Sequence, residues 1–389
     1  MIPRLIEKGV IDRLKLSNKI ILLLGARQVG KTTLVQNIKS VLESQGQKVL
    51  YLNCDIMEEK SAINTTSRVV IENLTSNLDV LFIDEAQNLD NPGLTLKDIQ
   101  AIRPQLKILA TGSSGFELKN KTSDALTGRY LDFTLYPLSA SEMLSVNNVS
   151  GNNALMQQSA VALLPTMLTF GFYPGVYTET APAQKETQLL KIVESYLFKD
   201  ILSFQRIRNS EVIKNLSKAL AYQIGSVVNE NELSKRLGVD RKTVAHYIDI
   251  LEKTFVVIRV RPLSRNPRRE IGRGYKVYFT DLGIRNALIG DFNPVDLRSD
   301  IGFLWENFLF IERMKVFANN ARNLQAYFWR SYGGGEVDYI EEVAGNKTQA
   351  YEFKYKDDKT SRGAKLFSGE YNIPVEVINR DNMLKFLTL

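Results

Sequence analysis

The glycine-rich segment GARQVGKT, residues 25–32, constrains the fold of this chain more than any other stretch. It follows the apolar run IILLL at 20–24 and precedes the helical pattern TTLVQNIKSVLES at 32–44. Glycines let the backbone wrap closely around a phosphate, and successive N–H groups at a helix N-terminus attract negative charge. The spacing G-x-x-x-x-G-K-[ST] between a strand and a helix therefore predicts a phosphate-binding loop in an α/β fold.

Apolar strand-like runs alternate with helical patterns from about residue 18 to 135, which is typical of a parallel α/β sheet. The runs are KIILLLG (19–25), KVLYLN (48–53), DVLFID (79–84) and LKILATG (106–112). The pattern is then mostly helical to about residue 225, with a break at TFGFYPGVY. Two short helices and strands with a basic loop follow to about 285, and the remainder has a helix followed by strands. The chain is therefore expected to have several domains.

The composition limits the chemistry of any bound metal. Cys54 is the single cysteine and His246 the single histidine, so a disulfide framework and a Cys/His zinc site are excluded and a metal must bind oxygen ligands. The net charge of +7 and a pI near 9.2 favour a polyanionic partner. IILLL is too short to cross a bilayer, and we expect no secretory leader in the charged start MIPRLIEKGVIDRLK. We expect a cytoplasmic protein without a membrane partner.

The phosphate-binding loop and the run DVLFIDEAQ, residues 79–87, predict one nucleotide site. Lys31 would reach the β- and γ-phosphates, and the Thr32 hydroxyl would bind Mg²⁺. Asp84 would hold Mg²⁺ through water and Glu85 would polarise the attacking water, because acids at the end of a buried strand lie at the mouth of the ligand crevice. The expected nucleotide-binding residues of the loop are Gly25, Ala26, Arg27, Gln28, Val29, Gly30, Lys31, Thr32 and Thr33.

Four segments resemble the AAA+ class of P-loop ATPases, in a prokaryotic branch with an appended C-terminal domain of unknown function. The segments are GARQVGKTTL (25–34), FIDEAQNL (82–89), LATGSSGFEL (109–118) and LTGRYLDFTLYPLSASE (126–142). The resemblance implies ATP as the nucleotide, and Ser113 or Ser114 as the sensor of the γ-phosphate. It makes Arg129 the candidate arginine finger, in cis or in a neighbouring subunit; the alternative is a surface arginine. Monomer and homo-oligomer both stay open.

Residues 229–260 carry a helix-turn-helix pattern. Gly238 makes the turn and Asp240 caps the second helix, on which Arg241, Lys242, Thr243 and His246 point away from the apolar stripe. The strands FVVIRV and YKVYFT flank the basic loop RPLSRNPRREIGRG, which predicts the wing of a winged helix suited to DNA phosphates. A purely architectural module is the alternative.

The segment GGGEVDYIEEVAGNKTQAYEFKYK, residues 333–356, predicts a hairpin with acids on one face. If the loop is 344–346, Asp338 lies opposite Glu352 and Glu336 opposite Lys354; a two-residue loop would send Asp338 and Glu352 to opposite faces. Facing carboxylates can hold Mg²⁺ or Mn²⁺, with Lys354 beside them to stabilise developing charge. In the alternative, Glu336 and Lys354 form a surface salt bridge and the acids are solvated.

This arrangement resembles the PD-(D/E)xK nuclease superfamily, with Asp338 on one strand and Glu352-x-Lys354 on the next. The resemblance implies a glutamate on a preceding helix, for which Glu306 is the candidate; a carboxylate in so apolar a helix needs a partner or a metal. Arg330 is the candidate phosphate contact. The expected architecture is a P-loop AAA+ type core (1–140), a helical lid (141–225), a winged helix (226–288) and an α+β restriction-endonuclease-like domain (289–389).

Three functional hypotheses follow from these features. The leading one is an ATP-hydrolysing switch that contacts DNA and gates a metal-dependent nuclease domain. The second is an ATP-driven regulatory or scaffolding protein whose C-terminal domain binds a partner without catalysis. The third, an ATPase that acts on proteins, lacks an aromatic pore-loop pattern.

Overall fold

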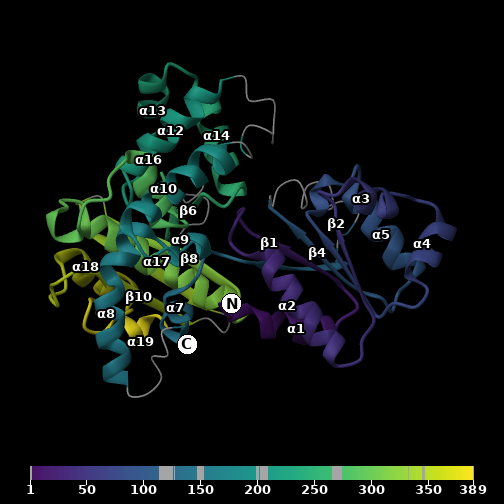
Figure 1. The fold of residues 1–389 in the computed structure, drawn as a ribbon. Coiled ribbons are helices and arrows are strands. Elements are labelled where there is room, and N and C mark those ends of the chain that lie inside the picture. Colours follow the sequence, from purple (N-terminus) through teal and green to yellow (C-terminus); the bar gives the residue numbers. More distant parts are fainter. Residues whose placement is uncertain are drawn as a thin grey trace.

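The computed structural model of the chain describes residues 2–113, 126, 128–146, 153–198, 201, 209–264, 274–331, 333–343 and 347–388. In these ranges the long strands form a five-stranded and a six-stranded sheet. The first sheet and its helices lie on the right in Figure 1, and the later elements form the larger body on the left. The N-terminal helix α1 lies under the first sheet, near the contact between the two bodies.

The first sheet is parallel throughout and has the strand order β2-β3-β4-β1-β5. Its strands are β1 (Ile20–Leu24), β2 (Val49–Asn53), β3 (Val80–Asp84), β4 (Lys107–Gly112) and β5 (Tyr130–Thr134). The first four coincide with the four apolar runs, so the predicted parallel α/β sheet is confirmed.

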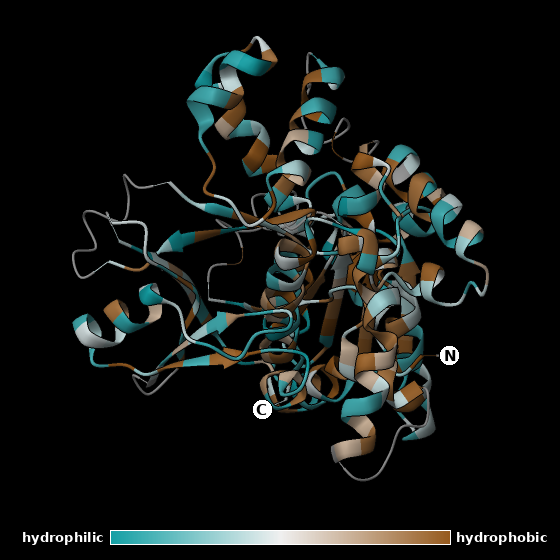
Figure 2. Cartoon of the chain, turned by 90° about the vertical axis from the view of Figure 1, so that its left-hand side faces the viewer, coloured by the Kyte–Doolittle hydropathy of each residue, from teal (hydrophilic) through white to brown (hydrophobic). Residues whose placement is uncertain are grey.

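Helices cover both faces of this sheet because alternate strand residues point to opposite sides. Ile21 and Leu23 belong to the core that includes the apolar side chains of α1 and α2, whereas Ile20 and Leu22 belong to the core under α3, α4 and α5. The helices are α1 (Ile6–Leu16), α2 (Lys31–Ser44), α3 (Met57–Ile63), α4 (Arg68–Thr75) and α5 (Pro92–Ile102), with the short turn η1 (Ala86–Asn88) after β3. Outlying helices alternate teal and brown in Figure 2, as amphipathic helices do.

The middle of the chain is helical, as predicted. Its elements are α7 (Ala140–Val146), α8 (Asn153–Phe170), α9 (Pro174–Tyr177), α10 (Pro182–Lys191), η2 (Ile192–Leu197) and α12 (Ser210–Tyr222). Helix α8 ends at Phe170 because Gly171 adopts φ +68°, and a Cβ there would lie 2.1 Å from an oxygen of Asp281. None of the helices in the described ranges is long and apolar enough to cross a membrane.

The predicted helix-turn-helix is formed by α13 (Glu230–Leu237) and α14 (Arg241–Lys253). Gly238 ends α13 with φ +66°, and the Asp240 carboxylate accepts the Thr243 N–H at 2.9 Å to cap α14. The antiparallel strands β6 (Val257–Pro262) and β7 (Lys276–Phe279) follow. Residues 265–273 of the basic loop lie outside the described residues.

The second sheet has the order β11-β10-β9-β8-β6-β7. Its remaining strands are β8 (Leu324–Arg330), β9 (Glu336–Val343), β10 (Lys347–Phe353) and β11 (Val375–Ile378). The accompanying helices are α16 (Leu282–Ile289), η3 (Val295–Leu297), α17 (Ile301–Asn319), α18 (Arg362–Tyr371) and α19 (Met383–Phe386). Because β6 pairs with both β7 and β8, the sheet continues across the boundary expected at residue 288. The domain boundaries stay a prediction.

Helix α17 is buried along most of its length, on every side, from Leu304 to Phe317. It packs under the second sheet and also contacts α1, α8 and α16. Charged side chains of α17 therefore lie in the interior, where each needs a partner.

Candidate functional site

The loop at residues 25–30 joins β1 to α2 and borders a cavity of about 350 Å³. Gly25 is required because a Cβ there would lie 2.2 Å from the Leu135 carbonyl oxygen, and Gly30 has φ +96°. The Lys31 ammonium donates to the carbonyls of Gly25 and Ala26, each at 3.0 Å. The cavity is lined by Arg27, Gln28, Gly30, Lys31, Thr32, Thr33, Asp55, Glu85 and Pro174. Six of the expected nucleotide-binding residues thus line one cavity, and Gly25, Ala26 and buried Val29 complete the loop.

Asp84, at the end of β3, is buried and accepts several hydrogen bonds. The Thr32 hydroxyl donates to one carboxylate oxygen at 2.7 Å, so the two expected Mg²⁺ ligands lie together. The Tyr51 hydroxyl donates to the same oxygen at 2.7 Å, and the Thr111 hydroxyl donates to the other. Burial, together with the bond to Asp84, raises the pKa of Tyr51, which keeps its hydroxyl a donor. Sequence reasoning missed Tyr51 and Thr111 because it did not establish which strands flank β3.

Glu85 lines the cavity with an unusual backbone conformation, φ +51°. Its N–H donates to the Thr111 hydroxyl at 3.0 Å. The Gln87 amide donates to the Glu85 carboxylate and, at 3.2 Å, to the Ser113 hydroxyl. Ser113 is therefore linked to the predicted catalytic acid through Gln87. The alternative sensor, Ser114, lies outside the described residues.

Arg129 is exposed and directly precedes β5. Tyr130 pairs with Ile20, the first residue of β1, whereas the phosphate-binding loop follows the last residue of that strand. A five-residue strand separates these two edges of the sheet by about 16 Å. This placement favours a role for Arg129 in a neighbouring subunit over one in cis, and both roles stay predictions.

The buried side chain of Arg4 binds the backbone of the phosphate-binding loop. The Arg4 guanidinium donates to the carbonyls of Val29 and Tyr136, each at 2.7 Å. It also pairs with Glu142, which is 1% exposed, at 3.1 Å. The other oxygen of Glu142 accepts the Ser139 N–H at 2.8 Å. The loop is thus tied to the start of α7.

Residues 138–140, next to Glu142, also form hydrogen bonds with side chains of α17. The Ala140 N–H donates to Glu312 at 2.6 Å, and the Lys315 ammonium donates to the Leu138 carbonyl at 2.8 Å. Glu312 and Lys315 pair with each other at 2.7 Å and are each 1% exposed. Residues 138–142 therefore connect the phosphate-binding loop to α17 through buried polar contacts.

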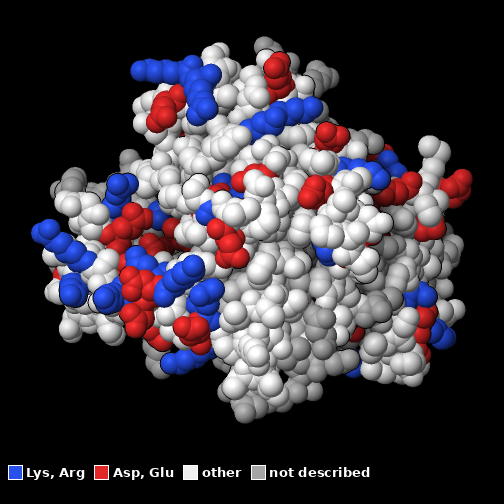
Figure 3. Space-filling view, turned by 60° about the vertical axis from the view of Figure 1, so that its left-hand side comes forward, with Lys and Arg blue, Asp and Glu red and all other residues white. Residues whose placement is uncertain are grey.

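A second cavity, of about 620 Å³, lies between α17, the second sheet and α18. Glu306, Arg330, Asp338, Glu352 and Lys354, all singled out from the sequence, line it together. The further lining residues are Gly225, Ser226, Val227, Lys276, Phe303, Gly333, Gly334, Gly335, Glu336, Ser361, Arg362, Gly363 and Leu366. Asp and Glu side chains gather on the left of Figure 3 with Lys and Arg around them.

The hairpin register is the one predicted for a loop at 344–346, since Val343 pairs with Lys347. Asp338 accepts the Phe353 N–H at 2.7 Å. Glu352 and Lys354 both line the cavity, but Glu352 is already engaged: it pairs with Lys354 at 2.8 Å and accepts the Ser361 N–H at 2.8 Å. Burial opposes the charge on Lys354, but Glu352 outweighs it and raises the pKa of Lys354.

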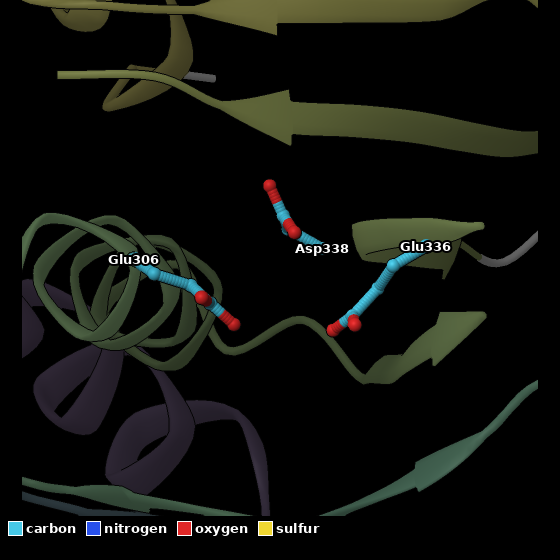
Figure 4. A group of neighbouring side chains, drawn as sticks. All are labelled: Glu306, Glu336 and Asp338. Carbon is cyan, nitrogen blue, oxygen red and sulfur yellow. The ribbon is translucent and has the colours of Figure 1, made fainter. Parts of the chain in front are cut away.

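Three acids of the cavity converge in a group that shares only Asp338 with the predicted metal-binding pair. One oxygen each of Glu306, Glu336 and Asp338 lies within 4.8 Å of the others, and Figure 4 shows the three side chains converging from α17 and β9. Glu336 joins Asp338 because residues two apart on a strand share a face. The group thus contains Glu306 and Glu336 in place of Glu352. The surface salt bridge considered for Glu336 is also corrected, because Glu336 pairs with Lys276.

Lys276, on β7, places an ammonium among these acids and was not predicted. It is 2% exposed and pairs with Glu306 at 2.8 Å and with Glu336. Burial alone would lower the pKa of Lys276, but the two carboxylates outweigh burial and raise it. Burial, reinforced by Glu306, raises the pKa of Asp338 to about 7. The Lys276 ammonium therefore already balances part of the negative charge of these acids.

Three family models match parts of the chain. Residues 17–144 match an AAA domain, and residues 161–294 and 301–381 match two domains of unknown function. The chain therefore contains an AAA domain. The second match extends across the boundary expected at 225/226.

Among curated relatives, an uncharacterized protein of Haemophilus influenzae is 26% identical over 280 residues, which cover 68% of each chain. One of Mycobacterium tuberculosis is 24% identical over 346 residues, covering 88% of this chain and 71% of its own. AMPPCP-bound DnaA from Aquifex aeolicus superposes with TM-score 0.29 at 17% identity, over 63% of this chain and 86% of its own. Saccharomyces cerevisiae Hsp104 superposes with TM-score 0.29 at 16% identity, over 64% of this chain and 38% of its own. These superpositions are too loose to bear on function.

Proposed function

We propose that the chain is an ATP-hydrolysing switch that contacts DNA through a winged helix and cleaves phosphodiesters at the acidic cavity. The observation that carries the proposal is the convergence of Glu306, Asp338, Glu352 and Lys354 on one cavity together with Arg330. Acids that can bind a divalent cation, beside cations that can bind phosphate, are what phosphodiester hydrolysis requires.

At the nucleotide site, the loop N–H groups and Lys31 bind the phosphates of ATP, and Thr32 and Asp84 hold Mg²⁺. The hydrogen bond from Thr32 to Asp84 supports this assignment, because it brings the two groups together beside the loop. Glu85 orients the attacking water, and its bond from Gln87 connects it to Ser113.

At the acidic cavity, Glu306, Glu336 and Asp338 would hold Mg²⁺ or Mn²⁺, which supplies Lewis-acid activation of water and phosphate. Lys354 stabilises the charge that develops on a phosphoryl oxygen, and Glu352 keeps its ammonium in place. Arg330 binds a neighbouring phosphate from the exposed end of β8.

DNA would also contact the helix pair α13 and α14 and the β6–β7 hairpin, which we interpret together as a winged helix. Arg241, Lys242 and His246 are exposed on α14. Both helices lie at the top of Figure 1, where α14 packs on β6 of the second sheet. The exposed basic side chains of α14 favour DNA contact over a purely architectural role.

We further propose that ATP controls the acidic cavity. The support is the buried path from Val29 through Arg4 and Glu142 to Glu312 on α17, the helix that carries Glu306. A loop that moves with the bound nucleotide would shift α17 through these contacts.

Cleavage assays on plasmid and oligonucleotide DNA test this function with Mg²⁺ or Mn²⁺, with and without ATP. Wild type should cut DNA, Asp338→Ala should not, and Lys31→Ala should lose the response to ATP. A second function, an ATP-driven regulator with a non-catalytic partner-binding domain, is favoured by the ammonium of Lys276, which already neutralises the acids. That function predicts that no variant, wild type included, cuts DNA.

A further inference from the structure

The mouth of the acidic cavity carries two large apolar side chains that packing does not explain. Phe303 is 47% exposed and Leu366 is 48% exposed, and both line the cavity. Phe303 lies three residues before Glu306, so the ring and the carboxylate share one face of α17. An exposed aromatic ring beside a charged floor indicates a ligand with both a flat apolar part and a charged part.

The backbone at Gly225 lies close to the Phe303 ring and has no side chain to displace it. Gly225 has φ +74°, and a Cβ there would lie 3.1 Å from the Phe303 ring and 3.3 Å from an oxygen of Glu306. A side chain at residue 225 would therefore crowd both the ring and the carboxylate. The glycine keeps both at the same edge of the cavity.

Cations also line the cavity. Arg330 and Arg362 are exposed and line the cavity, and Lys354 lies deeper beside Glu352. Guanidinium groups bind phosphates in a bidentate manner. The cavity lining thus combines an exposed aromatic ring, acids and cations.

We propose that this cavity binds single-stranded nucleic acid, with one base stacked on Phe303 and the adjoining phosphates held by Arg330 and Arg362. The inference rests on the proposed function and specifies its substrate class. Bases inside a duplex are stacked on each other and offer no free face, whereas unpaired bases stack on aromatic side chains. A duplex is therefore a poorer ligand unless a base leaves the stack.

Fluorescence anisotropy with a labelled single-stranded oligonucleotide tests the inference, with the blunt duplex of the same sequence as comparison. Ca²⁺ replaces Mg²⁺ to neutralise the acids, and a gel checks that the oligonucleotide stays intact. Wild type should bind the single strand more tightly. Phe303→Ala should weaken that binding about 5- to 150-fold, the loss typical of one base stack, and Phe303→Trp should retain it.

The matched control is Leu297→Ala, which removes an apolar side chain that is 78% exposed and does not line the cavity. It should leave binding unchanged, and unchanged thermal unfolding of Phe303→Ala excludes a folding defect. If the strand binds Phe303→Ala as tightly as wild type, or wild type prefers the duplex, the inference is overturned while the proposed function stands. If neither nucleic acid binds wild type, the proposed function fails too, and a partner protein is favoured at this surface.

Discussion

Replacing Lys276 with methionine should make the stability of the protein depend on divalent cations. Methionine keeps an apolar stem near the Phe328 ring, over which the ammonium lies at 5.3 Å, but removes the charge between Glu306 and Glu336. The two carboxylates then face each other without a counter-ion. A divalent cation can take the place of the ammonium, because the oxygens that surround Lys276 remain.

The size of the effect follows from burial. Removing one partner of a buried ion pair costs about 3–5 kcal/mol. Because the Glu336 side chain remains 31% exposed, we take the lower end, about 3 kcal/mol. At about 2–4 °C per kcal/mol for a folded unit of 150–250 residues, Lys276→Met should lower Tm by about 6–12 °C in chelator. A cation present at 100 times its Kd should restore about 2.7 kcal/mol.

Calorimetric or fluorescence-detected unfolding in EDTA, Mg²⁺ and Mn²⁺ measures this effect. The matched control is Lys385→Met, because Lys385 pairs with Glu376 at 3.7 Å on the surface and is 82% exposed. Exposed pairs contribute little, so the control should unfold like wild type under every condition. The reasoning is refuted if Lys276→Met unfolds like wild type in EDTA, or if divalent cations raise its Tm no more than that of wild type.

Three further changes probe the nucleotide site and its connection to α17. Tyr51→Phe removes a donor to Asp84 and should weaken Mg²⁺-dependent nucleotide binding several-fold with the fold intact, measured by titration with a fluorescent ATP analogue. Glu312→Gln keeps the shape of the side chain but weakens its pair with Lys315. ATP hydrolysis should persist, while the effect of ATP on oligonucleotide binding should disappear. An unchanged ATP effect would count against a connection from the loop to α17 through Arg4, Glu142 and Glu312. Arg129→Ala should leave the ATPase rate of dilute protein unchanged; a loss seen only at high protein concentration would support a role in a neighbouring subunit.

Local patterns predicted the features that depend on neighbouring residues. The four apolar runs located β1 to β4, and the glycine spacing located the loop before α2. The sequence left two hairpin registers open, and the one that pairs Val343 with Lys347 puts Asp338 and Glu352 on one cavity. These features are fixed by a few residues of chain, so the sequence contains them directly.

Features that depend on distant segments were missed. Lys276 lies 30 residues before Glu306 and reaches the acids only because β6 joins β7 to the second sheet. Arg129 lies at the sheet edge opposite the phosphate-binding loop because β5 runs parallel to β1, which no local pattern reveals. Strand order also brings Tyr51 next to Asp84. The long-range pairing of strands, which carries this information, is not encoded in any short motif.

The most direct measurement is a calorimetric titration of the nucleotide-free protein with Mn²⁺. Wild type should bind one ion that Asp338→Asn no longer binds and that Asp84→Asn, altered at the other cavity, still binds; Lys276→Met should bind it more tightly. A heat of Mn²⁺ binding that is unchanged by Asp338→Asn, or abolished by Asp84→Asn alone, would contradict the proposal that α17 and β9 together form a divalent cation site.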